Sequence, residues 1–210
     1  MKKLSFTTIL VAGLLTGAHA TTLKIESMVP GLSQAVTINY NGNNQNVLAG
    51  AQSVRVDGAN PIALYCVDLD HANHFGDTYG VNIQGVSTVA NSAKVSNLMT
   101  NFWSTLDTST EAAAFQLALW DVVVDGGDGL NTGNFKGVNI GSSVATKFSE
   151  YQSLINSGGP ENLTISVYNA TSHGQNGNIY QNLIGAQAVP EPATLLIAPA
   201  LIAFLKKRKK

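Results

Sequence analysis

Residues 108–124 read TSTEAAAFQLALWDVVV, and this stretch decides how the rest of the chain can fold. Thr108 and Glu111 have the spacing of a capping box, in which each residue satisfies a backbone amide of the other at the start of a helix. The apolar run continues to about Val124, and the glycines that follow can end a helix. The sequence therefore predicts a helix over residues 109–124 with an apolar centre.

The sequence on either side of this helix predicts two more helices and several strands. Apolar residues that recur every three or four positions predict helices near residues 91–106 and 142–156. Short runs before and after the helices, such as 36–40 and 163–167, are typical of strands. The order is β, then α, then β. We expect residues 21–188 to form one α+β domain, mainly an antiparallel β-sandwich with an inserted helical subdomain.

The N-terminal segment has the pattern of a secretory signal peptide. It is basic at its start, apolar over residues 9–15, and ends on Ala18 and Ala20, the small-x-small pattern of a signal cleavage site. We predict a signal peptide over residues 1–20. An uncleaved anchor is the weaker alternative, because the apolar run is too short to span a bilayer.

The C-terminal segment pairs a proline-rich hinge with a short apolar run. Pro190, Glu191 and Pro192 break regular structure, residues 195–205 carry no charge, and residues 206–210 are all basic. An apolar helix of this length covers only part of a hydrocarbon core, and the basic cluster would stay on the cytoplasmic side. We expect a short sorting helix that holds the chain at the inner membrane, with the domain outside.

Residues 189–210 resemble the PEP-CTERM sorting signal, which has the same order of Pro-Glu-Pro, apolar run and basic end. The resemblance implies a Gram-negative bacterium that makes exopolysaccharide. It also implies that exosortase, a membrane-embedded processing enzyme, cuts near the motif and passes the protein to the cell surface or the extracellular matrix. A plain C-terminal anchor is the alternative.

The domain itself is acidic. Residues 21–188 hold five of the 12 Lys and Arg residues and twelve of the 13 Asp and Glu residues, which gives a net charge of −7. An acidic body without a basic stripe argues against a nucleic-acid partner.

Cys66 is the one cysteine in the sequence, so it cannot form an internal disulfide. It is buried and inert, paired between chains, or committed to other chemistry. It lies in the strand-like run 64–68, which would place Cys66 and Asp68 on one face. Gln116 lies in the apolar centre of the predicted helix, where an amide is costly unless it has a defined partner.

A Cys-Φ-Asp strand and a Gln-x-Ala-Φ-Trp helix resemble the bacterial thioester domains of surface adhesins. The resemblance implies that Cys66 and Gln116 join in an internal thioester with loss of ammonia, with Asp68, Ala118 and Trp120 in supporting positions. It implies covalent attachment to an amine-bearing surface or matrix partner, without a cofactor and without enzymatic turnover. Members of that family mostly belong to Gram-positive surfaces, unlike the tail of this chain.

Two other functions compete with covalent adhesion. The first is a non-catalytic domain that binds polysaccharide or matrix, with Cys66 as a buried thiol. The second is a secreted hydrolase with a Cys66–His71 dyad, for which the sequence offers no orienting third residue.

Two acidic clusters could suggest metal sites. Residues 68–77 hold three aspartates and two histidines, and Asp121, Asp125 and Asp128 follow one another among glycines. The first group matches no defensible ligand spacing, and the second fits a glycine-rich helix exit that carries solvated acids. We expect no metal in either place.

Overall fold

The structure is a computed structural model that describes residues 21–160, 162–171 and 180–189. The predicted signal peptide and Pro190-Glu191-Pro192 lie outside these residues, so both stay predictions. None of the helices in the described residues has the length and hydropathy of a membrane span.

Seven strands of the described chain form one antiparallel sheet, and three α-helices accompany it. The strands are β1 (Thr21–Tyr40), β2 (Asn43–Val56), β3 (Ile62–Cys66), β4 (Thr78–Gly85), β5 (Phe135–Asn139), β6 (Leu163–Ala170) and β7 (Leu183–Ala188). The helices are α1 (Ser92–Phe102), α2 (Ser109–Asp125) and α3 (Ser142–Ser153), with 3₁₀ turns at Val86–Thr88 and Trp103–Thr105. An α+β fold built mainly from antiparallel strands is therefore confirmed, and all three helices and β5 lie between β4 and β6 in the chain.

The strand pairings run in a closed circuit. The order is β2-β3-β7-β6-β4-β1, and β1 pairs with β2 again, while β5 adds to the far half of β1. The long β1 pairs with β2, β4 and β5. Its ladder with β2 shifts register between Met28 and Ser33, and such irregularities bend a strand, so its two halves can reach different partners. The β1–β2 hairpin turns at Asn41-Gly42, both with positive φ, as the tightest hairpin turns require.

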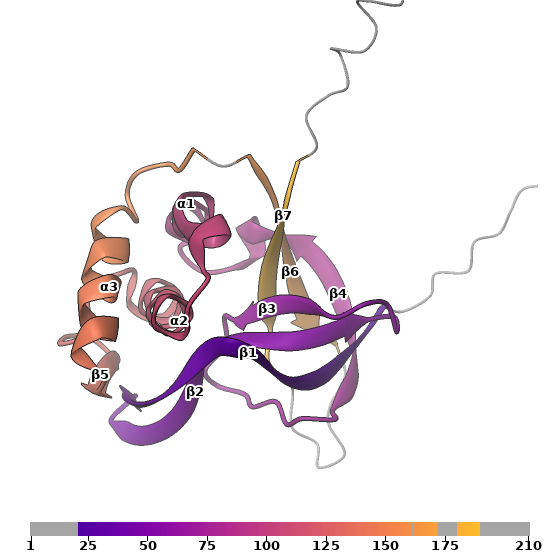
Figure 1. The fold of residues 1–210 in the computed structure, drawn as a ribbon, viewed down its shortest axis with the longest axis horizontal. Coiled ribbons are helices and arrows are strands. Elements are labelled where there is room, and N and C mark those ends of the chain that lie inside the picture. The colour runs from indigo at the N-terminus through magenta and orange to yellow at the C-terminus, as the bar shows by residue number, and fades with distance from the viewer. Residues whose placement is uncertain (1–20, 161, 172–179, 190–210) are drawn as a thin grey trace, which may run out of the picture.

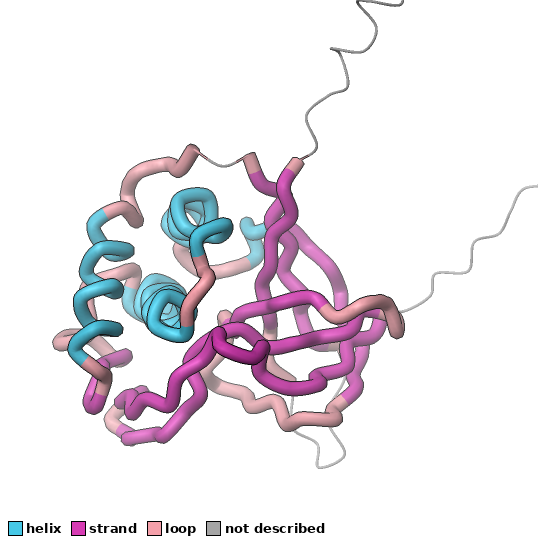
Figure 2. Tube along the Cα trace, viewed as in Figure 1, coloured by secondary structure: helices cyan, strands magenta, loops and turns pink. Residues whose placement is uncertain are grey.

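Helix α2 runs through the centre of the helical side of the molecule. Thr108 Oγ1 accepts from the Glu111 amide at 3.2 Å, and the Glu111 carboxylate accepts from the Thr108 amide at 3.0 Å, so the capping box is formed. Every residue from Ala112 to Val122 is buried. The helix ends at Asp125, and Gly126 caps it in the left-handed conformation. Figures 1 and 2 show the helices gathered on one side of the strands, with the β1–β2 ribbon reaching beneath α2.

Strand β3 ends earlier than the strand-like run 64–68 predicted. It ends at Cys66, whose partner on β7 is Leu183, and Asp68 lies in the loop that follows. The Asp68 carboxylate accepts the amides of Asp70 at 2.9 Å and Asn182 at 3.4 Å, and these bonds turn the chain out of the sheet. The expectation that Cys66 and Asp68 share one strand face is therefore wrong.

Candidate functional site

The side chain of Gln116 meets the backbone of Cys66. The Cys66 amide donates to Gln116 Oε1 at 2.9 Å, and Gln116 Nε2 donates to the Cys66 carbonyl at 2.7 Å. Cys66 ends β3 and Gln116 lies in the middle of α2, and both are at most 2% exposed. The carboxamide thus bonds to Cys66 as a neighbouring strand would. This pair of bonds satisfies the one glutamine that is buried in the described core.

The sulfur of Cys66 is held by the loop after β3. Its thiol donates to the Asp68 carbonyl at 2.8 Å, and the Asp68 amide donates to the sulfur at 3.3 Å. Burial raises the pKa of the Cys66 thiol to about 12, and the hydrogen bond from the Asp68 backbone and the nearby Trp120 indole oppose that rise without cancelling it. Cys66 is therefore a neutral thiol near pH 7 and needs a proton acceptor before it can act as a nucleophile.

Trp120 lies one helical turn after Gln116. Its ring packs edge-on against Phe135 at 6.0 Å between centroids. Its indole N–H lowers the pKa of the Cys66 thiol, although within the described residues it meets no acceptor at full hydrogen-bond geometry. Ala118 is buried in the same helix. Trp120 and Ala118 therefore belong to the same buried helix as Gln116, and Trp120 lines the cavity beside the sulfur.

Cys66, Gln116 and Trp120 all line one cavity of about 280 Å³. Its walls come from β1, β2 and the loop after β3. No Asp, Glu, Lys or Arg of the described chain lines it, and its titratable groups are Cys66 and His71. Leu48 and Phe75, two of the most exposed large apolar side chains, also line it. The paired residues thus border a cavity that exposed side chains also line, although each is almost fully buried.

His71 reaches this cavity as the partner of Asp68. Its Nδ1 lies 2.6 Å from Asp68 Oδ2, and the side chains are 31% and 8% exposed. His74 instead lies 3.5 Å from Asp77 and is 82% exposed. The expected polar loop 68–77 therefore divides into two separate pairs. Sequence reasoning considered His71 only as part of a hydrolase or metal site, because nothing local shows that Asp68 binds both the sulfur and the histidine.

The second acidic group is brought together at the end of α2. One carboxylate oxygen each of Asp121, Asp125 and Asp128 lies within 4.8 Å of the others. Asp121 accepts from the Gly129 amide at 3.1 Å, and Asp125 accepts from Phe135 at 2.7 Å. Asp121 is only 1% exposed, so the expectation that these acids are all solvated is wrong for it. Burial raises the pKa of Asp121 to about 6.

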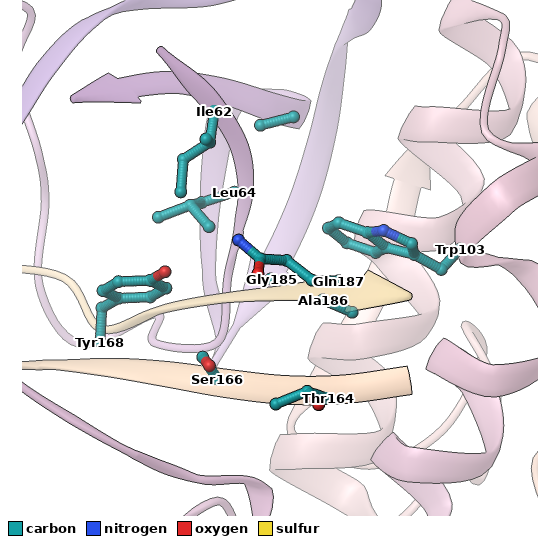
Figure 3. A pocket seen from close by; sticks show the side chains of 10 residues that line it. Ile62, Leu64, Trp103, Thr164, Ser166, Tyr168, Gly185, Ala186 and Gln187 are labelled. Carbon is teal, nitrogen blue, oxygen red and sulfur yellow. The ribbon is translucent and has the colours of Figure 1, made fainter. Parts of the chain in front are cut away.

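A second cavity, of about 260 Å³, lies over β3, β6 and β7 (Figure 3). Trp103 and Tyr168 stand at its two ends, and the polar groups between them come from Thr164, Ser166 and Gln187. Nothing in the sequence pointed to it, since its residues come from segments that are far apart in the chain.

The fold therefore brings the two predicted motifs into one place. Gln116 bonds to the backbone of Cys66, Trp120 lines the same cavity, and Asp68 holds the sulfur through its backbone. No family model matches the chain, and comparison with curated proteins and with solved structures gives no match either.

Proposed function

We propose that this protein is an exported surface or extracellular-matrix protein whose Cys66 and Gln116 form an internal thioester, for covalent attachment to amine-bearing partners. The observation that carries the proposal is the position of the Gln116 carboxamide. Two hydrogen bonds across fifty residues fix it against Cys66 in a buried site that opens onto a cavity. We further propose that the closed sheet with inserted helices is a thioester-domain type of fold, a β-sandwich with a helical subdomain.

The geometry favours the reaction that such a bond needs. The sulfur attacks Cδ of Gln116, the Cδ–Nε2 bond breaks, and the amide nitrogen leaves as ammonia. Oε1, which carries negative charge in the tetrahedral intermediate, already accepts the Cys66 amide at 2.9 Å. A backbone donor placed in advance at that oxygen stabilises the charge without further reorganisation. Attack on an amide also needs the sulfur and Cδ held close together, and both side chains lie in the same buried site.

Attachment would then use the same oxygen and the same donor. An amine attacks Cδ, the Cδ–Sγ bond breaks, and the partner stays on Gln116 through an amide bond while Cys66 becomes a thiol again. The site acts once for each molecule, which makes the protein a covalent binder rather than an enzyme.

The proposed export is compatible with the edges of the sheet. Thr21, the residue after the proposed signal peptide, is the first residue of β1 and pairs with Val81. At the other end β7 stops at Ala188, just before the sorting segment. Cleavage at both places would leave every strand pairing intact. N-terminal sequencing and C-terminal peptide mapping of surface material test this, and recovery of residues 206–210 on released protein would contradict sorting by exosortase.

Intact mass tests the thioester most directly. We expect wild-type protein, purified without amines, to weigh one ammonia less than its processed sequence and to gain methylamine stoichiometrically. Cys66→Ala and Gln116→Ala should each have the full mass and take up none, because the bond needs both residues.

Gln45→Ala is the matched control, since Gln45 lines the same cavity from β2 but does not bond to Cys66. It should keep the mass deficit. A wild-type protein of full mass, with a Cys66 thiol that reacts stoichiometrically after denaturation, would falsify the thioester.

The second cavity favours one alternative, non-covalent binding of polysaccharide or matrix. Aromatic side chains beside hydroxyl and amide groups suit a ligand that is apolar on its ring faces and polar at its edges (Figure 3). Binding of purified exopolysaccharide to Cys66→Ala separates the two functions. Full retention together with a wild-type protein of full mass would favour this alternative.

A further inference from the structure

We propose that His71, oriented by Asp68, transfers the protons at the thioester site, taking one from the incoming nucleophile and delivering one to the sulfur of Cys66. The inference rests on the proposed function, and it names the residue that would transfer protons when the thioester forms and when it reacts.

The first support is where His71 lies. It lines the same cavity as Cys66 and Gln116, and apart from Cys66 it is the one titratable residue among the described residues that do so. A nucleophile that approaches Gln116 through this cavity would therefore enter a space that His71 also lines. Among the described residues, no carboxylate, lysine or arginine lines the cavity to take this role instead.

The second support is how His71 is held. Asp68 Oδ2 binds Nδ1 of the ring at 2.6 Å, which leaves Nε2 as the nitrogen for proton exchange. The carbonyl of the same Asp68 accepts the Cys66 thiol at 2.8 Å. One residue therefore positions both the sulfur and the base. A carboxylate on one ring nitrogen fixes the tautomer and makes the other nitrogen the proton acceptor.

The third support is the chemical demand of the sulfur. Burial raises the pKa of the Cys66 thiol to about 12, so the thiolate is both scarce as a nucleophile and poor as a leaving group. Each direction of the reaction therefore needs a group that accepts a proton and returns it.

Attachment of an amine exchanges one bond at Gln116 for another. The nitrogen of an amine bonds to Cδ of Gln116, and the Cδ–Sγ bond breaks with its electron pair on sulfur. Nε2 of His71 removes the proton from that nitrogen and gives it to the sulfur. The products are a substituted amide on Gln116, a neutral Cys66 thiol and an unchanged His71. Formation of the thioester is the reverse, with ammonia in place of the amine.

His71→Gln tests the proposal, with His74→Gln as the matched control. Both histidines pair with an aspartate in the same loop, but His74 is 82% exposed and does not line the cavity. Among molecules that carry the mass deficit, His71→Gln should take up methylamine about a hundredfold more slowly, the usual contribution of a general base, whereas His74→Gln should match wild type. Added imidazole should restore much of the rate in His71→Gly.

The outcomes separate the two proposals. His71→Gln that carries the deficit and reacts at the wild-type rate overturns the role of His71 and leaves the thioester standing. Wild-type protein of full mass that takes up no amine overturns both. If His71→Gln never forms the thioester, the test is His71→Gly with added imidazole. Loss of one ammonia from His71→Gly when imidazole is present supports the role of His71, and an unchanged full mass overturns it.

Discussion

At the scale of single residues, the carboxyl group of Asp121 should make stability depend on pH. Burial raises its pKa from 3.8 to about 6 in the folded protein. Between these values the unfolded chain gives up the proton first, so the folded state binds more protons and the free energy of unfolding falls as pH rises. The contribution is fully present below pH 3.8 and is lost as pH rises through about 6.

Asp121→Asn should therefore abolish this part of the pH dependence. Denaturant unfolding at pH 4 and pH 7 measures it, and the variant should improve relative to wild type at the higher pH. Asp107→Asn, at an exposed carboxylate before α2, serves as the control. An Asp121→Asn variant that follows the wild-type pH profile would count against a buried, proton-binding Asp121.

Gln116 and His71 mark what sequence can and cannot predict about the site. A polar residue in an apolar helix must have a partner, so the need for one near Gln116 could be predicted, and the motif pointed to Cys66. That the partner is the backbone of Cys66 and not its sulfur depends on where β3 ends, which no local pattern gives. The Asp68–His71 pair depends on the same loop, and it was missed for that reason.

At the scale of elements, the start of α2 should be a measurable source of stability. Thr108→Ala removes the side-chain acceptor for the Glu111 amide and should cost about 1 kcal/mol of unfolding free energy. Thr146→Ala, at an exposed threonine within α3, is the control and should change little. An equal decrease in the unfolding free energy of the two variants would show that the cap at Thr108 does not stabilise the protein more than an ordinary exposed threonine does.

Helices and strands differ in how well they could be predicted. Helix α2 carries its own start and stop signals, and the structure has it at Ser109–Asp125. In α1 and α3 the helix ends before the predicted limit, because the last apolar residues of each pattern lie in the turn that follows. The order in which the strands pair could not be predicted, because the β3–β7 and β4–β6 ladders join segments far apart in the chain and no local pattern marks such a pairing.

At the scale of the whole molecule, the proposed thioester is a cross-link between the strand circuit and the helices. It would close a loop of about fifty residues, which is worth roughly 4 kcal/mol on the chain-entropy model. Methylamine treatment should therefore lower the unfolding temperature of wild type and leave that of Cys66→Ala unchanged. Calorimetry before and after treatment measures this, and an unchanged wild type would contradict a stabilising cross-link.

The position of Gln116 along the chain has a mechanical consequence. A partner captured on Gln116 and a surface attachment beyond Ala188 would place tension on residues 117–188 alone, because these form the covalent path between the two points. Strands β1 to β4 and helix α1 would carry no tension through their own backbone. They would support the segment under tension only through strand pairing and core packing. The β3–β7 ladder, which ends at Cys66, joins these unloaded strands to β7, the last strand under tension.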